Sequence, residues 1–238
     1  FSPNFKLVRE IIEKSDSEIN FIIGGKATKD TYQKILKFST ENNLDIIIGD
    51  GEYITLDIVK DNLREKPIVL AGNKRVFSVM QDSIYLPKNI SNIQLDRSFF
   101  SNEPNLNPQG QLEANMVTSR GCIYNCSFCG AARSLNREFP IRMKSKKSIK
   151  AEVNHLKSIY PNLESIRILD DLFLRNIKDV ESASEIFRGN LYWRSMAHIL
   201  SFKGASSDLL NKLKQSGCSE VFIGIESGSK KILKMINK

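Results

Sequence analysis

Short apolar runs alternate with helix-like segments along most of this 238-residue chain, and this alternation constrains the fold more than any other feature. A strand, a helix and a second strand form the repeating unit of parallel α/β folds. In such folds the residues that follow the strands meet at one edge of the sheet, where ligands bind. The sequence therefore predicts an α/β protein with its functional residues at strand ends.

The first 72 residues contain three such units. The pattern predicts helices over residues 4–14, 31–42 and 54–65, and strands over residues 19–23, 45–48 and 67–71. The first two strands end in glycine turns, Gly24-Gly25 and Gly49-Asp50-Gly51-Glu52. Glycines let backbone amides approach a ligand closely. Ordinary strand-to-helix turns have the same composition, so these turns alone do not decide between the two interpretations.

The periodicity weakens between residues 73 and 110, where Pro87, Pro104 and Pro108 occur among many Asn and Ser residues. These residue types favour turns and loops. We therefore predict an interdomain connection over 73–110, between a first domain over 1–72 and a second over 111–238. Part of the connection is expected to pack against one domain, because structureless loops of this length are uncommon.

The second domain repeats the alternation. Strands are expected over residues 112–118, 165–169, 191–197 and 220–225, with helices over 148–159, 177–187 and 207–215. Asp170 and Asp171 follow the second strand, and Glu226 follows the fourth. Parallel β/α repeats with polar residues at the strand ends are typical of a barrel whose upper face carries the active site.

Three of the four cysteines, Cys122, Cys126 and Cys129, lie within eight residues just after the first strand of this domain. Thiolates bind soft metals and iron–sulfur clusters, and a four-iron cube held by three of them leaves one iron open to a substrate or cofactor. A zinc site would need paired CxxC ligands or a histidine at a recognisable spacing, and His155 and His198 lie well downstream. The spacing favours an iron–sulfur site.

Two other cysteine chemistries are disfavoured. A disulfide framework is typical of short, cysteine-dense secreted chains, and this chain is neither short nor cysteine-dense. A ferredoxin would show tighter CxxCxxC spacing and a nearby fourth cysteine, whereas Cys218 lies far beyond Cys129 in a Ser-Gly-Cys-Ser turn. We interpret Cys218 as a small structural residue.

Charge and hydropathy limit the partners. The net charge of +8 permits an anionic partner, but the densest basic stretch, residues 142–150, lacks the interleaved aromatics of a single-strand binding platform. A solvated face is the favoured interpretation, so nucleic-acid binding is not indicated. The sequence has no secretory signal and no apolar run long enough to span a membrane, which predicts a cytoplasmic protein. Phe1 and Lys238 suggest a fragment of a longer protein.

The CxxxCxxC spacing, with Phe128 directly before the last cysteine, closely resembles the signature of the radical S-adenosylmethionine (SAM) enzymes. In that family three cysteines hold a 4Fe-4S cluster, and the amino and carboxylate groups of SAM bind the fourth iron. The resemblance implies that one electron, from an external donor such as flavodoxin or ferredoxin, cleaves SAM to methionine and a 5′-deoxyadenosyl radical. That radical takes a hydrogen from a small-molecule or peptide substrate. The family core has six strands, of which four are visible here.

The same resemblance assigns roles to single residues. It places Phe128 near the adenine, and Asp170 and Asp171 match an Asp-Asp-x-Phe motif where an acid lies near the SAM ammonium, although an acid there can also cap a helix. Glu226 matches a motif that accepts hydrogen bonds from ribose hydroxyls, with a surface acid as the alternative. His198 and Arg194 are weaker candidates for the SAM carboxylate, because a lone strand-end histidine is more often structural.

Residues 22–28 and 48–52 resemble the second half of the cobalamin-binding domain that precedes many radical SAM cores. In those relatives the turns line the nucleotide tail of cobalamin, which implies a binding role for Gly24, Gly25, Gly49, Gly51 and Glu52. An earlier Asp-x-His-x-x-Gly loop, which supplies a histidine to cobalt in some relatives, has no counterpart here.

The expected fold is α/β, with a partial flavodoxin-like parallel sheet of the cobalamin-binding type followed by a partial (β/α) barrel of the radical SAM type. Methyl transfer that depends on cobalamin is the leading function. One alternative is a cobalamin-independent radical SAM reaction, as in a methylthiotransferase or a ring rearrangement. The other is a non-catalytic iron–sulfur module.

Overall fold

The computed structural model describes residues 5–25, 27–97, 104–189 and 191–238 of the chain. They divide into two units, Phe1–Lys88 and Asn89–Lys238, each with its own core. Both units are α/β, as the alternation of the sequence predicts. Within the described residues, no helix has the length and apolar character that crossing a membrane requires.

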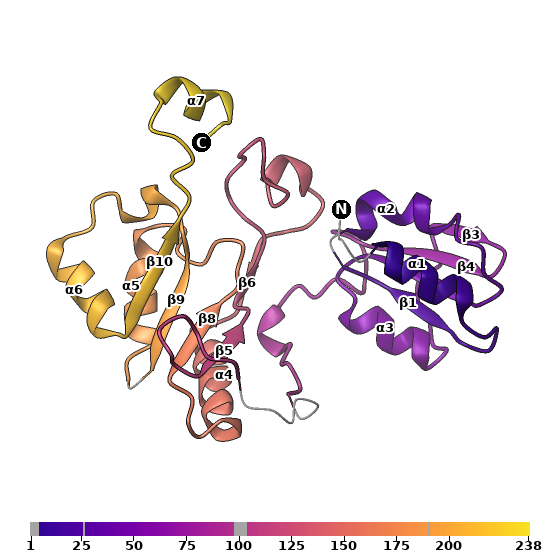
Figure 1. Cartoon of the computed structure of the whole chain (residues 1–238), viewed down its shortest axis with the longest axis horizontal. Helices are drawn as coiled ribbons and strands as arrows, with labels where there is room; N and C mark the ends of the chain where they lie inside the picture. Colours follow the sequence, from indigo (N-terminus) through magenta and orange to yellow (C-terminus); the bar gives the residue numbers. More distant parts are fainter. Residues whose placement is uncertain (1–4, 26, 98–103, 190) are drawn as a thin grey trace. The chain divides into compact units, whose positions relative to one another are not determined.

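The first unit is built on a four-stranded sheet in the order β1-β2-β4-β3 (Figure 1). β1, β2 and β4 run parallel, and β3 pairs antiparallel with β4 at the sheet edge. The strands β1, β2, β3 and β4 cover Phe21–Ile23, Leu44–Gly49, Val69–Ala71 and Lys74–Val79. The helices α1, α2 and α3 cover Phe5–Lys14, Thr28–Ile35 and Glu52–Val59.

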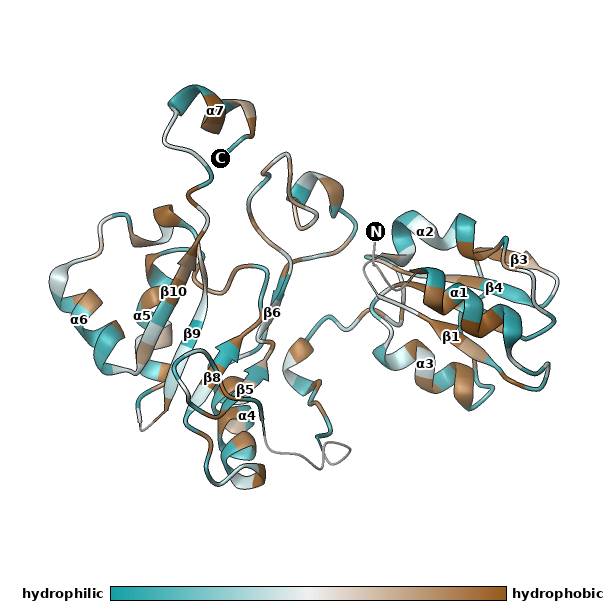
Figure 2. Cartoon of the chain, viewed as in Figure 1, coloured by the Kyte–Doolittle hydropathy of each residue, from teal (hydrophilic) through white to brown (hydrophobic). Residues whose placement is uncertain are grey.

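The centre of the first unit is the run of isoleucines in β2. Ile47 is 1% exposed and packs against Ile54 of α3 and Phe77 of β4. Figure 2 shows hydrophobic residues along β1, whereas the helices mix polar and hydrophobic residues. α3 ends earlier than the sequence predicts, because Asp61 adopts a left-handed conformation at φ 50° just after it.

The predicted connection over 73–110 is wrong at its start, because Lys74–Val79 forms β4 within the sheet of the first unit. The cations that open this strand mask its apolar character, but both are compensated. Arg75 donates to Asp45 of β2 at 2.6 Å, and Lys74 donates to the carbonyl of Leu36 at 3.0 Å. The segment predicted as a third parallel strand, 67–71, instead forms the edge strand β3 of a hairpin with β4.

The second unit contains a fully parallel sheet in the order β10-β9-β8-β5. In chain order the strands β5, β8, β9 and β10 cover Glu113–Met116, Ser165–Ile168, Tyr192–Ala197 and Cys218–Ile223. The helices α4, α5, α6 and α7 cover Lys146–Ile159, Ile177–Ile186, Ser207–Gln215 and Lys230–Met235. Short 3-10 helices, η1, η2 and η3, cover Ile90–Asn92, Arg133–Leu135 and Ile199–Phe202. The sequence predicted these four strands and α4, α5 and α6 to within a few residues.

Alternation along the strands gives this sheet two different faces. Ile166 and Ile168 of β8 and Trp193 of β9 lie in the core with Leu156 of α4 and Phe187, which follows α5. The residues between them point to the opposite face, which we call the inner face, and several of those are charged. The helices therefore cover one face, and the inner face carries both charged and apolar side chains.

Gly217 makes the connection from α6 into β10 possible. Its φ is +95°, and a Cβ atom on it would lie 2.1 Å from the carbonyl oxygen of Leu191. The carbonyl of Gly217 accepts a hydrogen bond from the amide of Trp193 at 2.9 Å. Only glycine combines this backbone conformation with this close approach, so Gly217 sets where β10 begins to pair with β9.

Candidate functional site

The three clustered cysteines lie on a loop that projects from the carboxyl edge of the second sheet. A two-stranded ribbon closes the loop, because β6 (Ser119–Arg120) pairs antiparallel with β7 (Arg142–Met143). Cys126 is buried, whereas Cys122 and Cys129 are partly exposed. Arg133 holds the base of the loop by donating to the carbonyls of Asn136 at 2.6 Å and Phe139 at 2.9 Å.

Backbone amides of the loop contact the cysteines. The amide of Tyr124 donates to the sulfur of Cys122 at 3.4 Å, and the amide of Cys129 donates to the carbonyl of Cys126 at 3.1 Å. Burial raises the pKa of the Cys122 thiol, and the nearby Cys129, Asp171 and Cys126 raise it further. Metal ligation needs the thiolate, so binding at this loop would release protons.

Among the described residues, no three His, Cys, Asp or Glu side chains converge as the ligands of a single metal ion would. A four-iron cube is wider than one ion, and each of its thiolates binds a different iron. The soft sulfur donors and their CxxxCxxC spacing therefore favour a cluster over a zinc ion.

Cys218 differs from the three loop cysteines in place and chemistry. It opens β10 and packs against the core of the second unit. Burial raises the pKa of its thiol to about 12, which keeps the thiol protonated at neutral pH. An inert, protonated thiol is what a structural cysteine requires.

Asp170 anchors the cysteine loop to the sheet. Its carboxylate accepts hydrogen bonds from the amide and hydroxyl of Thr118, at 2.6 and 2.5 Å, and from the hydroxyl of Ser119 at 2.7 Å. Asp170 is 3% exposed, and burial raises its pKa while these hydrogen bonds oppose the rise. The carboxylate therefore joins the end of β8 to the strand that enters the loop.

Asp171 and Phe128 lie nearer to the cysteines and to solvent. Asp171 is partly exposed, and its charge acts on the Cys122 thiol. The Phe128 side chain is 56% exposed. Both are thus closer to solvent than Asp170.

His198 contacts the cysteine loop from the end of β9. Its ring stacks on Tyr124 with centroids 3.9 Å apart, and its Nδ1 accepts a hydrogen bond from the amide of Leu200 at 3.2 Å. This bond leaves the proton of the neutral ring on Nε2. Burial lowers the pKa of His198, with a smaller contribution from Lys238. The stack is a second tie between the sheet and the loop.

The two remaining SAM candidates have different environments. Glu226 follows β10 in a left-handed conformation, at φ 59°, and its carboxylate lies 3.4 Å from Lys238 Nζ. Arg194 does not reach the strand ends, because its side chain is buried between Glu113 and Glu220. Its assignment to a SAM carboxylate is therefore wrong, since the neighbouring carboxylates take up its donors.

Sequence reasoning missed Thr118, Ser119 and Tyr124. Thr118 is the last residue of the strand predicted over 112–118 and Ser119 follows it, but their acceptor Asp170 lies 52 and 51 positions away, so no local signal marked them. Tyr124 had none, because its partner His198 is distant in the sequence.

In the first unit, the two predicted glycine turns come together at one sheet edge. β1 and β2 are parallel neighbours, so Gly24-Gly25 and Gly49-Asp50-Gly51 follow adjacent strand ends. The hydroxyl of Thr28 donates to the carbonyls of Gly25 and Ile47, each at 2.7 Å, and links the first turn to β2. Gly49 has φ +102°, and Glu52 is the first residue of α3.

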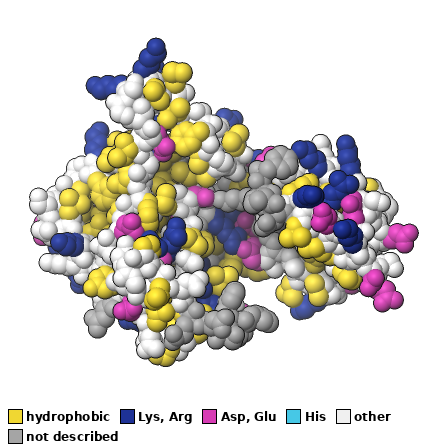
Figure 3. Space-filling model, viewed as in Figure 1, with side chains coloured by type: hydrophobic (Ala, Val, Ile, Leu, Met, Phe, Trp, Pro, Cys, Tyr) yellow, Lys and Arg dark blue, Asp and Glu magenta, His cyan; other side chains and the backbone are white. Residues whose placement is uncertain are grey.

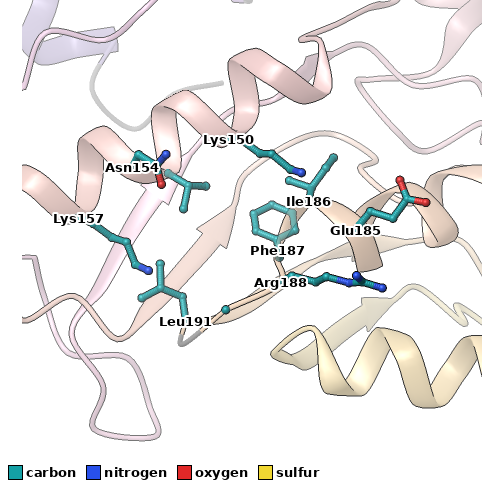
Figure 4. A pocket seen from close by; sticks show the side chains of 10 residues that line it. Lys150, Asn154, Lys157, Glu185, Ile186, Phe187, Arg188 and Leu191 are labelled. Carbon is teal, nitrogen blue, oxygen red and sulfur yellow. The ribbon is translucent and has the colours of Figure 1, made fainter.

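The second unit also contains a cavity of about 490 Å³ (Figure 4). It is lined by residues of α4 and of the end of α5, including Lys150, Lys157, Phe187 and Arg188. These segments precede the strands, so the cavity belongs to the edge opposite the cysteine loop. It is separate from the candidate cluster site.

The basic stretch over residues 142–150 is partly used within the fold. Arg142 is 8% exposed, and Lys144 pairs with the buried Glu152 of α4. Lys146 forms an ion pair with Glu185 at 2.8 Å. These cations are engaged in contacts within the second unit.

Comparisons with known proteins agree with this geometry. A family model described as the radical SAM superfamily matches residues 116–238. An uncharacterized methyltransferase of Pyrococcus horikoshii is 29% identical over 126 residues, which cover 52% of this chain and 26% of that protein. The cytidylyl-2-hydroxyethylphosphonate methyltransferase of Streptomyces wedmorensis is 29% identical over 134 residues, covering 54% of this chain and 24% of that protein. The chain spans well under half of their length.

Solved structures show the same fold over both units. The apo form of the cobalamin-dependent SAM radical enzyme OxsB has a TM-score of 0.55 at 14% identity, covering 98% of this chain and 38% of that one. OxsB with aqua-cobalamin and SAM bound has a TM-score of 0.54 at 13% identity, with the same coverage. This likeness extends the agreement from the cysteine-bearing unit to the glycine-turn unit.

Proposed function

The chain belongs to the radical SAM superfamily, and from this premise we propose that its second unit holds a 4Fe-4S cluster and SAM as part of a methyltransferase. The observation that carries the proposal is the loop of three thiols tied to the sheet by Asp170 and His198. Cys122, Cys126 and Cys129 would bind the cluster, which supplies the electron for SAM cleavage when it is bound and reduced.

The residues around the loop would bind and orient SAM. We propose that Asp171 meets the SAM ammonium, because opposite charges attract most strongly where water is partly excluded. Glu226 would accept hydrogen bonds from the ribose, and Phe128 would cover the adenine. His198 and Asp170 would act through the loop by holding it in place. The exposed face of the loop would receive an external one-electron donor such as flavodoxin or ferredoxin, in the cytoplasm.

Anaerobic reconstitution with iron and sulfide tests the cluster. About four irons and an equal amount of sulfide per chain are expected, together with 5′-deoxyadenosine when dithionite and SAM are added. A protein that takes up one zinc and no sulfide would contradict the proposal. A protein that binds the cluster without cleaving SAM would favour the non-catalytic module instead.

Cobalamin would bind at the first unit. The support is the pair of glycine turns at one sheet edge and the fold shared with OxsB, whose structure contains cobalamin. Gly24, Gly25, Gly49 and Gly51 would let the backbone approach the nucleotide tail, with Glu52 beside them. Retention of a corrinoid after gel filtration, read from its visible absorbance, is the expected result. Loss of all corrinoid would favour the cobalamin-independent reaction.

A further inference from the structure

The inner face of the second sheet carries two arginines in different electrostatic states. Arg167 of β8 and Arg194 of β9 are paired in register, and both lie opposite the residues that enter the core. The guanidinium carbons lie 5.8 and 5.6 Å from the ring centroid of Phe222 on β10. Two cations therefore contact one aromatic ring.

Arg194 is neutralised within the fold. Its Nε and Nη2 donate to the two carboxylate oxygens of Glu113, each at 2.6 Å, and its Nη1 donates to Glu220 at 3.0 Å. Burial alone would raise the pKa of Glu113, but Arg194, with Asn107 and Ser165, lowers it overall. Arg194 therefore has a carboxylate on each side of its guanidinium, and these carboxylates compensate its charge.

Arg167 has no such compensation. Its side chain is exposed, and within the described residues no carboxylate forms an ion pair or hydrogen bond with it. Its strand neighbour on the other side is Asn115 of β5, which carries no charge. The contact with Phe222 orients the guanidinium but leaves its hydrogen-bond donors available.

The surroundings of Arg167 suit part of a substrate. Figure 3 shows hydrophobic side chains gathered over β9 and β10, and Met196 and Tyr192 are 40% and 51% exposed there. Arg167 lies three residues before Asp170, which corresponds to about 10 Å along a strand. The Arg167 cation thus lies beside an apolar surface, about 10 Å along the strand from the edge that carries the cysteine loop.

We propose that Arg167 binds an oxyanion of the substrate, a phosphate, phosphonate or carboxylate group, on the inner face of the sheet. The proposal rests on the proposed function, because it assigns the substrate side of that same barrel. A planar guanidinium matches the paired oxygens of these groups and forms two parallel hydrogen bonds with them. Phe222 and its apolar neighbours would contact the carbon part of the same substrate.

The test uses three probes that share one ring. Phenyl phosphate and phenylacetate carry oxyanions, and benzyl alcohol is neutral. Their dissociation constants are measured by ligand-observed NMR with the cluster-loaded protein at low salt. The wild type is expected to bind at least one oxyanion more tightly than benzyl alcohol, and the difference between the two oxyanions identifies the preferred group.

Matched variants locate the binding site. Arg167→Gln is expected to weaken binding of the preferred oxyanion about tenfold or more, because a charge-assisted pair is lost, and to leave benzyl alcohol binding unchanged. Arg167→Lys keeps the charge without the planar fork and should fall between the two. Lys157→Gln removes a cation from the outer cavity instead, and its oxyanion binding is expected to stay within about twofold of wild type.

Two outcomes would overturn the inference. The first is oxyanion binding by Arg167→Gln equal to wild type. The second is an equal loss of SAM affinity in that variant, measured by equilibrium dialysis, since this would assign Arg167 to the cofactor. Failure of the proposed function would look different, because the wild-type protein would then bind no four-iron cluster whatever its affinity for the probes.

Discussion

Both units contain parallel strands, but the residues at the strand ends differ between them. In the first unit, strands β1 and β2 end in glycine turns, and the hydroxyl of Thr28 links the first turn to β2. In the second, the strand ends carry Asp170 and His198, whose side chains reach across to the cysteine loop. The first edge is built from backbone turns, whereas the second fixes a loop by side-chain contacts. One architecture thus ends its strands in two ways, which suit the two kinds of binding that we propose.

Replacing a loop cysteine should have the largest effect, and this effect should be confined to the second unit. Cys126→Ala removes the most buried of the three thiols, so cluster absorbance and 5′-deoxyadenosine formation are expected to fall to background. Corrinoid retention by the first unit should persist. Cys218→Ala is the matched control and should load iron normally, because its protonated thiol is not a ligand. Equal loss of cluster in both variants would contradict the assignment.

The anchor at Asp170 should have the next largest effect. Asp170→Asn replaces one accepting oxygen with an amino group that faces the donors of Thr118 and Ser119. We expect the free energy of unfolding of the second unit to fall by about 1–3 kcal/mol, with reduced iron uptake.

Trp193, the only tryptophan in the chain, lies in the core of the second unit, so its fluorescence during urea unfolding reports this unit selectively. Asp208→Asn is the control, because Asp208 is an exposed residue of α6 whose ion pair with Lys212 adds little stability. An unchanged urea midpoint for Asp170→Asn would show that Asp170 does not anchor the loop.

A substitution in the first unit should affect the stability of that unit and leave the cluster of the second unit in place. Gly49→Ala places a side chain at φ +102°, which is expected to cost about 1–3 kcal/mol of local stability. Gly51→Ala is the control, since its φ is −94° and a Cβ there would make an ordinary contact with Thr55 at 3.5 Å. Hydrogen exchange of the β2 amides measures the difference. A loss of cluster in Gly49→Ala would show that the units are not independent.

The smallest expected effect concerns pH. The pKa of His198 is lowered by burial, so the unfolded chain takes up the proton at a higher pH than the folded chain. The contribution of neutral His198 is therefore complete above the unfolded pKa of about 6.5 and is lost as pH falls toward the lower folded value.

Variants of the two histidines check this sign. His198→Asn should reduce the dependence of Trp193-reported stability on pH between about 5 and 8, and should cost about 0.5–1.5 kcal/mol at the upper end through loss of the stack on Tyr124. His155→Asn, on the exposed side of α4, should keep the wild-type dependence. Stability that rises on acidification, and does so only when His198 is present, would reverse the interpretation.

Local sequence patterns predicted most strands because apolar runs and the turns that end them are adjacent in the chain. β4 was missed because Lys74 and Arg75 hide it, and their partners come from other elements. The cysteines were singled out from their spacing alone and Asp170 from its place after a strand, and their roles toward a cluster and SAM stay predictions. The anchoring contact of Asp170 was not foreseen, since 52 positions separate it from its partner Thr118. Arg194 was misassigned for the same reason, because Glu113 neutralises it from another strand.

The close approach of Gly217 to Leu191 limits which residues a mutated gene can encode at position 217. A Cβ at this position would lie 2.1 Å from the carbonyl oxygen of Leu191, so one of the two backbone segments would have to shift. Saturation mutagenesis with selection for activity should therefore recover a single codon family at position 217, while neighbouring Ser219 accepts several. Gly217→Ala should therefore inactivate the second unit in a living cell while every residue proposed to bind a cofactor stays unchanged.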